Sequence, residues 1–182
     1  MQECGVGLVR IRRDGKRLAF AAPPLRRSGP LDAGTLQRIA GALRIRPEAI
    51  GASSWCDNGP GWVAVMLGSR AEVLALKPDA AAMDDLKIGV AGPWQAGDGE
   101  DAQFEVRAFV PGMGGVKEDP VTGSLNAGLG QWLIGAGLAP ASYVACQGTA
   151  LGRDGRIHVQ KVGDDVWVGG ETVTCVEGTV TL

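Results

Sequence analysis

The sequence has a single histidine, His158, and only four cysteines, none of them in a Cys-x-x-Cys pair. Structural zinc sites use closely spaced Cys and His ligands, and disulfide-bonded domains are rich in cysteine. Neither a metal site nor a disulfide framework is therefore expected. Every cysteine lies in an apolar or strand-like stretch, which predicts buried thiols. The four are Cys4, Cys56, Cys146 and Cys175.

Long apolar runs are also lacking. No stretch reaches the roughly 18 apolar residues of a membrane-spanning helix, and the first residues lack the regions of a secretory signal. The formal net charge of −2 gives no broad positive surface for nucleic acid or an anionic membrane. The basic residues between Arg10 and Arg17 alternate along expected strands, as on a solvated face. We expect a cytoplasmic protein that binds neither nucleic acid nor membranes.

Hydrophobic residues make up 45% of the chain, enough for a sizeable core. Asp14-Gly15 predicts a hairpin between Gly7–Arg13 and Lys16–Ala22. Helical spacing predicts helices at Leu31–Leu43, Ser69–Leu76 and Pro78–Leu86. The remaining expected strands are Trp62–Leu67, Lys87–Ala91, Gln103–Val110, Tyr143–Gln147, Gly155–Lys161, Val166–Val168 and Val173–Leu182.

The stretch Glu118–Ser124 is the most informative, because it joins an acid, a proline and a Thr-Gly-Ser turn to an apolar helix. Asp119 can cap that helix by accepting a backbone N–H, and Pro120 suits its first position. The amides of Thr122–Ser124 would then be free at a helix N-terminus, which attracts carboxylates and phosphates. The alternative is an ordinary capped core helix without a ligand.

The helix after this motif carries glycines within its apolar pattern. Gly128, Gly130 and Gly135 lie inside the helical repeat of Leu125–Ala136, and each should cost about 1 kcal/mol relative to alanine. That cost is offset where glycine lets neighbouring backbones approach closely. The sequence therefore predicts an α+β fold in which a strongly curved, mostly antiparallel sheet wraps around a central helix.

Several segments together resemble a known family. They are Asp57–Trp62, Phe104–Phe109, Pro111–Gly114, Glu118–Ser124 and Gln147–Gly155. They resemble the phenazine-biosynthesis PhzF-like isomerases, which share the diaminopimelate epimerase fold. The resemblance implies two pseudo-symmetric halves, each a curved sheet around a helix, with the substrate in the cleft between them. It also implies proton transfer without a cofactor or metal.

By this resemblance, Asp119 and Ser124 line the active site and Gly123 offers its backbone N–H to the ligand. With Pro120 and Thr122 they form the candidate site for a small anionic metabolite. A capping carboxylate accepts N–H bonds that favour its charged form, so we expect Asp119 to position substrate rather than act as the general base. No cysteine lies in this motif, so the two-cysteine mechanism of racemases with this fold is not available.

Members of the family are longer than this chain, and their first-half motifs, including a glutamate taken as the acid/base, find no match in it. We expect residues 1–54 to be a remnant of a first half and residues 55–182 a complete C-terminal half. Such a truncated sheet would expose unpaired backbone groups and an apolar face. Residues 1–22 should therefore pair with the chain's own second domain, with a second copy in a homodimer, or with a separate first-half chain.

Three functions are compatible with these features. The first is an isomerase or epimerase that is weak or inactive alone. The second is a binding or structural module that keeps the anion site without catalysis. The third is a subunit that completes its site with another chain. His158 is expected to be an ordinary strand histidine.

Overall fold

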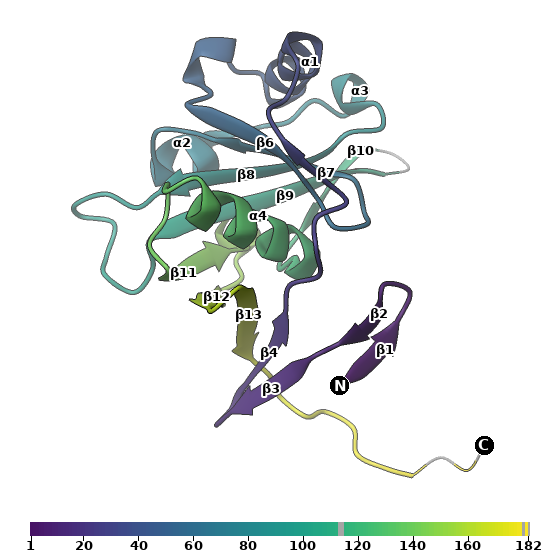
Figure 1. Cartoon of the computed structure of the whole chain (residues 1–182). Helices are drawn as coiled ribbons and strands as arrows, with labels where there is room; N and C mark the ends of the chain where they lie inside the picture. The colour runs from purple at the N-terminus through teal and green to yellow at the C-terminus, as the bar shows by residue number, and fades with distance from the viewer. Residues whose placement is uncertain (113–114, 180, 182) are drawn as a thin grey trace.

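The computed structural model describes residues 1–112, 115–179 and 181. One curved, mostly antiparallel sheet dominates this part of the chain and wraps around the central helix α4 (Gly123–Gly135) (Figure 1). The strand order is β3 (Ile11–Asp14), β4 (Arg17–Ala21), β13 (Asp165–Glu171), β12 (Gly155–Val162), β11 (Ser142–Gln147), β9 (Phe104–Gly112), β8 (Lys87–Pro93), β7 (Trp62–Met66), β6 (Ala52–Asp57) and β5 (Arg27–Gly29). In addition, β10 (Gly115–Asp119) pairs with β9. The expected mixed fold with a large sheet is thus confirmed.

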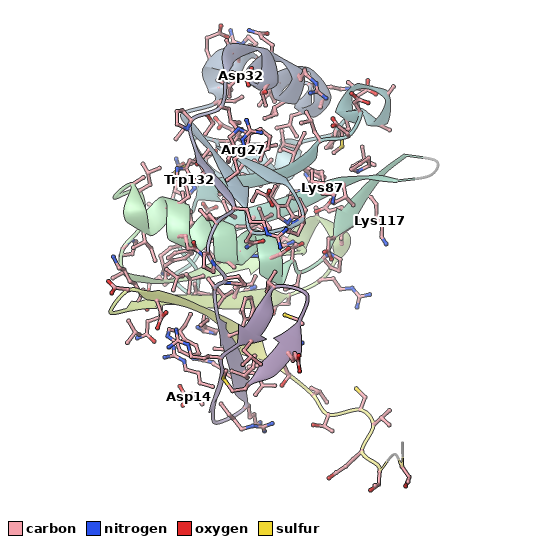
Figure 2. The ribbon with its side chains drawn as sticks, turned by 45° about the vertical axis from the view of Figure 1, so that its right-hand side comes forward. Asp14, Arg27, Asp32, Lys87, Lys117 and Trp132 are labelled. Carbon is pink, nitrogen blue, oxygen red and sulfur yellow. The ribbon has the colours of Figure 1, made fainter. Side chains whose placement is uncertain are left out.

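The remaining helices are short. Asp32 caps α1 (Ala33–Leu43) by accepting from Thr35 N, and Ser69 caps α2 (Arg70–Ala75) by accepting from Glu72 N. Figure 2 shows Asp32 at the start of α1, at the opposite end of the molecule from Asp14. The other helical segments are α3 (Ala80–Met83) and the 3₁₀ turns η1 (Pro47–Ala49) and η2 (Thr149–Leu151).

The sheet separates two hydrophobic cores, and β7 shows how. Trp62 and Ala64 belong to the core around α4, whereas Val63 and Val65 belong to the core that includes residues of α1, α2 and α3. Successive side chains of a strand point to opposite faces, so one strand supplies both cores. This alternation puts the Trp62 side chain on the same face as the start of α4.

Two glycines explain how α4 fits inside the sheet. A Cβ on Gly128 would lie 2.5 Å from the Cys56 backbone oxygen, and one on Gly130 would lie 2.8 Å from Val159 Cγ1. The prediction of close approach is confirmed at both positions. It is wrong for Gly135, because no atom lies within 4 Å of the place a Cβ would take.

The N-terminal segment differs from its expected form. The strand expected at Gly7–Arg13 is divided into two. Its first part, β2 (Gly7–Val9), pairs with β1 (Gln2–Cys4), and its second part, β3, pairs with β4 through the hairpin turn that follows Asp14. Strand β4 in turn pairs with β13. The sheet is therefore continuous across the expected division at residue 54, which also falls within β6. The division into two units stays a prediction.

The C-terminal expectation is wrong in the described residues. Residues 172–179 follow β13 without regular structure and extend away from the body (Figure 1). Strand formation needs a partner edge, and both edges of β13 are occupied, by β12 and β4. Val180 and Leu182 of the expected strand lie outside the described residues, as do Met113 and Gly114 of the Pro111–Gly114 match.

The buried cysteines lie in the body of the fold, and the exposed cysteines lie near its two ends. Cys56 and Cys146 are buried, as predicted. Cys4 and Cys175 are exposed, so the prediction is wrong for them. Cys4 lies on the exposed β1 and Cys175 on the segment after β13, and neither segment is covered by the cores.

Candidate functional site

The start of α4 is built differently from its sequence-based expectation. Strand β10 continues through Asp119, which pairs with Ala108 of β9. The helix begins at Gly123, with Thr122 as an N-cap whose side chain makes no capping bond. Asp119 is therefore not the cap, and Pro120 is not the first helical residue. Antiparallel pairing with the preceding strand β9 holds Asp119 in the sheet, and this outweighs its local tendency to cap.

The cap is supplied from another strand. Gln147, at the end of β11, is fully buried, and its Oε1 accepts from Thr122 N (3.1 Å) and from Asn126 Nδ2 (2.8 Å). Its Nε2 donates to the Asp119 backbone oxygen (2.8 Å) and to Thr122 Oγ1 (3.1 Å). The Thr122 N–H is thus already engaged, which corrects the expectation of three free amides.

The next two amides remain available. Within the described ranges, neither Gly123 N nor Ser124 N donates to a protein acceptor. The first-turn N–H groups of a helix have no intrahelical partner and carry part of its positive dipole. Gly123 is exposed and Ser124 is half-buried. These two N–H groups can therefore donate hydrogen bonds to a carboxylate or to a developing oxyanion.

Two hollows are lined by these residues, one by Ser124 and one by Gly123. The Ser124 hollow has a volume of about 550 Å³ and its walls include apolar side chains such as Val9 and Phe20. The Gly123 hollow has a volume of about 650 Å³ and contains charged groups, among them Arg156. Phe20 lines both hollows and lies next to Gly123. The start of α4 is thus accessible from either side of this ring.

The Ser124 side chain is oriented by two residues far away in the sequence. Trp62 Nε1 donates to Ser124 Oγ (3.0 Å), and Asn58 Nδ2 donates to the Ser124 backbone oxygen (2.8 Å). Asp57 Oδ1 holds the turn that carries Asn58 by accepting from the amides of Gly59 and Gly61, both at 2.7 Å. These bonds hold the connection between β6 and β7 beside the start of α4.

Charge in the Gly123 hollow is largely paired. Arg156 donates to Asp101 Oδ2 and to Cys146 Sγ (2.9 Å), and it forms an ion pair with Asp154. The Arg156 guanidinium holds the pKa of Asp101 below its ordinary value. Burial raises the pKa of the Cys146 thiol. Burial and the nearby Arg17 lower the pKa of His158, which also lines this hollow.

The structure brings together some of the predicted site residues. Gly123 and Ser124 each line a hollow, and Thr122 is buried beside them. Pro120 is exposed, and Asp119 is half-buried and lines neither hollow in the described structure. Their expected roles toward a ligand stay predictions.

Sequence reasoning missed the residues that support the site. The roles of Gln147, Asn126, Asn58 and Trp62 depend on contacts across 21 to 66 residues of sequence. A polar residue inside an apolar stretch, such as Asn126 in α4, is the signal that could have drawn attention to one of them. No cluster of potential metal ligands occurs among the described residues. Nor does that part of the chain contain a helix long and apolar enough to cross a bilayer.

Comparisons with known proteins identify the relatives of this chain. Residues 1–178 match the family described as "Phenazine biosynthesis-like protein". The "Uncharacterized isomerase YddE" of Escherichia coli K12 is 33% identical over 142 residues, covering 71% of this chain and 47% of that protein. The "Uncharacterized isomerase PA3578" of Pseudomonas aeruginosa is 30% identical over 180 residues, covering 97% of this chain and 62% of that protein.

Solved structures show the same fold. The chain superposes on a PhzF-family protein of Enterococcus faecalis with a TM-score of 0.69 and 21% identity, covering 97% of this chain and 62% of that one. The predicted epimerase PA4716 of Pseudomonas aeruginosa gives a TM-score of 0.65 at 22% identity, covering 90% and 58%. The chain thus spans about half to three fifths of the length of these relatives. On the family match and the shared fold, it belongs to the PhzF-like family of phenazine-biosynthesis-like proteins.

Proposed function

We propose that the N-terminus of α4 binds the carboxylate of a small metabolite and takes part in the cofactor-independent proton transfer of a PhzF-like isomerase. One observation carries the proposal: the amides of Gly123 and Ser124 have no acceptor within the described residues, and each residue lines a hollow. Family membership supplies the reaction class, because the curated relatives are named isomerases.

The chemistry follows from what these groups can do. Removing a proton next to a carboxylate or carbonyl places negative charge on an oxygen in the transition state. The two amides can hold that oxygen, and the hydroxyl of Ser124 is free to donate because Trp62 donates to it. Asp119 completes the proposed set as a positioning group at the end of β10.

We further propose that this chain alone is a weak catalyst. A proton transfer needs a general base close to the bound substrate. Among the described residues, the lining of the Ser124 hollow contains no carboxylate and no imidazole. In the Gly123 hollow, Asp101 and Asp154 are held in ion pairs with Arg156, so the groups of its described lining that could still act as a base are Glu171 and His158. A partner chain that supplies a general base close to the bound substrate would raise the rate of proton transfer.

An association partner is part of the same proposal. The β1–β2 hairpin exposes Val6 and Leu8, and the segment after β13 exposes Val173 and Val176, which are 85% and 89% accessible. A two-stranded hairpin has little stability by itself in water, so a second copy or a first-half chain is proposed to cover it. Light scattering during size-exclusion chromatography tests this, and a monodisperse monomer with protected hairpin amides would contradict it.

The alternative function is carboxylate binding without turnover. The unpaired amides favour it as much as the isomerase, and the absence of an acidic or imidazole group from the lining of the Ser124 hollow in the described structure favours it specifically. Binding and turnover are therefore separated by experiment.

The test is proton exchange into substrate carbon in heavy water, followed by proton NMR over a panel of small amino, hydroxy and unsaturated carboxylic acids. We expect slow exchange with the chain alone, and faster exchange when it is mixed with a chain supplying the base. Ser124→Ala should reduce the rate roughly 10²-fold, as for loss of one oxyanion donor. Ser142→Ala, at the exposed start of β11, is the matched control. Carboxylate binding without exchange in any mixture would leave only the binding function.

A further inference from the structure

Gln147 supplies the side-chain hydrogen bonds that, in the described residues, join β11 to the turn that carries the proposed site. Its two donors and its acceptor oxygen are all used, in four hydrogen bonds of 2.8 to 3.1 Å. An amide group can make about four such bonds, so its capacity is filled. A fully satisfied buried polar group holds its partners in one arrangement.

These four bonds hold both ends of the turn. On one side, Nε2 binds the Asp119 backbone oxygen, the last carbonyl of β10. On the other, Oε1 and Nε2 bind the amide and hydroxyl of Thr122, the residue before α4. Because one rigid amide plane joins the two ends, it fixes where the strand stops and where the helix starts.

Asn126 extends this arrangement into the first turn of α4. Its Nδ2 donates to the Thr122 backbone oxygen (2.9 Å) as well as to Gln147 Oε1, and the side chain is fully buried. The same Thr122 oxygen accepts the first helical bond, from Asn126 N (3.0 Å). The direction of the free amides that follow Thr122 therefore depends on groups held by Gln147.

We propose that Gln147 is the positioning residue of the carboxylate site: it caps α4 from β11 and so directs the Gly123 and Ser124 amides toward the ligand. It does not touch the ligand, since it is fully buried. Using Thr122 N–H for this cap also restricts the ligand to the next two amides. This inference rests on the proposed carboxylate site.

The test uses the full chain and pyruvate, a small carboxylate that stays anionic above about pH 4. Chemical shifts of the Gly123 and Ser124 amides are followed during titration. We expect saturable shifts in the wild type and an affinity at least about tenfold lower in Gln147→Met, which keeps the length of the side chain but removes its hydrogen bonds. The control is Gln131→Met, on the same helix, which removes one bond to the Pro23 oxygen and should keep the affinity within about twofold.

A second variant gives a readout that a merely structural residue would not change. In Gln147→Glu, an ionised carboxylate would face the Asp119 backbone oxygen and weaken pyruvate binding. Protonation restores one donor, so affinity should recover as the pH falls, and burial raises the pKa of such a carboxyl toward neutrality. The nearby titrating or charged groups, Asp119, Cys146, Arg153 and Arg156, are also present in the wild type, so their own titration affects both proteins.

The outcomes separate this inference from the proposed function. One outcome is that pyruvate binding depends on residue 147 while no carboxylic acid exchanges a proton. This outcome would support the positioning role of Gln147 and contradict the isomerase function. A folded Gln147→Met with wild-type affinity would overturn the inference, and so would the absence of pyruvate shifts at both amides. If Gln147→Met does not fold, Gln147→Glu decides: equal affinity to the wild type across about pH 5–8 overturns the inference.

Discussion

Trp62 Nε1 donates a hydrogen bond of 3.0 Å to Ser124 Oγ, which joins β7 to the first turn of α4. Because the Ser124 oxygen accepts from the indole, its own proton is free to donate elsewhere. Trp62 is 3% exposed, so the donor is held within the core around α4. A core residue thereby sets the direction in which the hydroxyl of the proposed site can act.

Replacing Trp62 with phenylalanine should separate this bond from the packing of the ring. Trp62→Phe loses the indole donor and leaves a small void, so we expect a loss of about 1–3 kcal/mol in the free energy of unfolding. Urea denaturation measures it. In a double-mutant cycle with Ser124→Ala, about 1 kcal/mol should be coupling between the two side chains. A coupling near zero would show that the bond contributes nothing to stability.

Glycine positions in α4 give a matched pair of substitutions. Gly128→Ala should destabilise the protein by about 1–3 kcal/mol, because the new methyl would meet the Cys56 backbone oxygen at 2.5 Å and the strand cannot yield easily. Gly135→Ala meets no atom within 4 Å and should be neutral or stabilising by up to about 1 kcal/mol. Thermal unfolding of both variants checks this. Equal effects at the two positions would refute the close-packing explanation.

The same helix shows what could be predicted from the sequence. Its apolar repeat and its internal glycines indicated a helix surrounded by sheet, and the contacts of Gly128 and Gly130 confirm that arrangement. This succeeded because the spacing of residues along one helix is a local property that records its surroundings. At its N-terminus, Gly123 and Ser124 of the predicted motif each line a hollow, and their role toward a ligand stays a prediction.

The errors come from strand pairing, which local sequence patterns do not reveal. Asp119 has the local signature of a helix cap, yet pairing with Ala108 keeps it in β10. Residues 173–179 have the composition of a strand, but both edges of β13, the strand that precedes them, are already paired. Strand β6 was missed because Ser53 and Ser54 obscure its pattern of buried and half-buried residues. A strand depends on its partner as much as on its own residues.

The ion pair of Arg107 and Glu118 anchors the start of the site motif. The two side chains are only 8% and 10% exposed, and they form two hydrogen bonds of 3.0 and 2.7 Å. Arg107 also donates to the carbonyl oxygens of Val73 and Leu76 at 3.1 and 2.9 Å. The pair therefore ties β9 and β10 to the end of α2.

Removing one member should be costly. Glu118→Ala leaves the guanidinium buried without its carboxylate, so we expect a loss of about 3–5 kcal/mol by urea denaturation. The comparator is Asp85→Ala, which breaks an ion pair with Arg38 whose acid is 81% exposed and should cost at most about 1 kcal/mol. Similar losses in the two variants would mean that burial does not determine the contribution of the Arg107 pair.

The pH dependence of stability should show a contribution from His158. Burial and the nearby Arg17 lower its pKa from an ordinary value of 6.5, while Glu171 opposes them. The unfolded chain then binds the proton more readily than the folded one. Above about pH 6.5 both states are neutral and the stability is complete, and it is lost as the pH falls from there through the lower folded-state pKa.

The pH range in which His158 affects stability is distinct from the range in which the carboxylates do. Hydrogen bonds lower the pKa values of Asp32 and Asp79, so their contributions are lost only as the pH falls below 3.8. Urea midpoints measured between about pH 7.5 and 5 should therefore decrease in the wild type and change less in His158→Gln, which carries no titrating group. If both proteins lose stability equally over this range, the loss does not come from the titration of His158, because every other titrating group is present in both proteins.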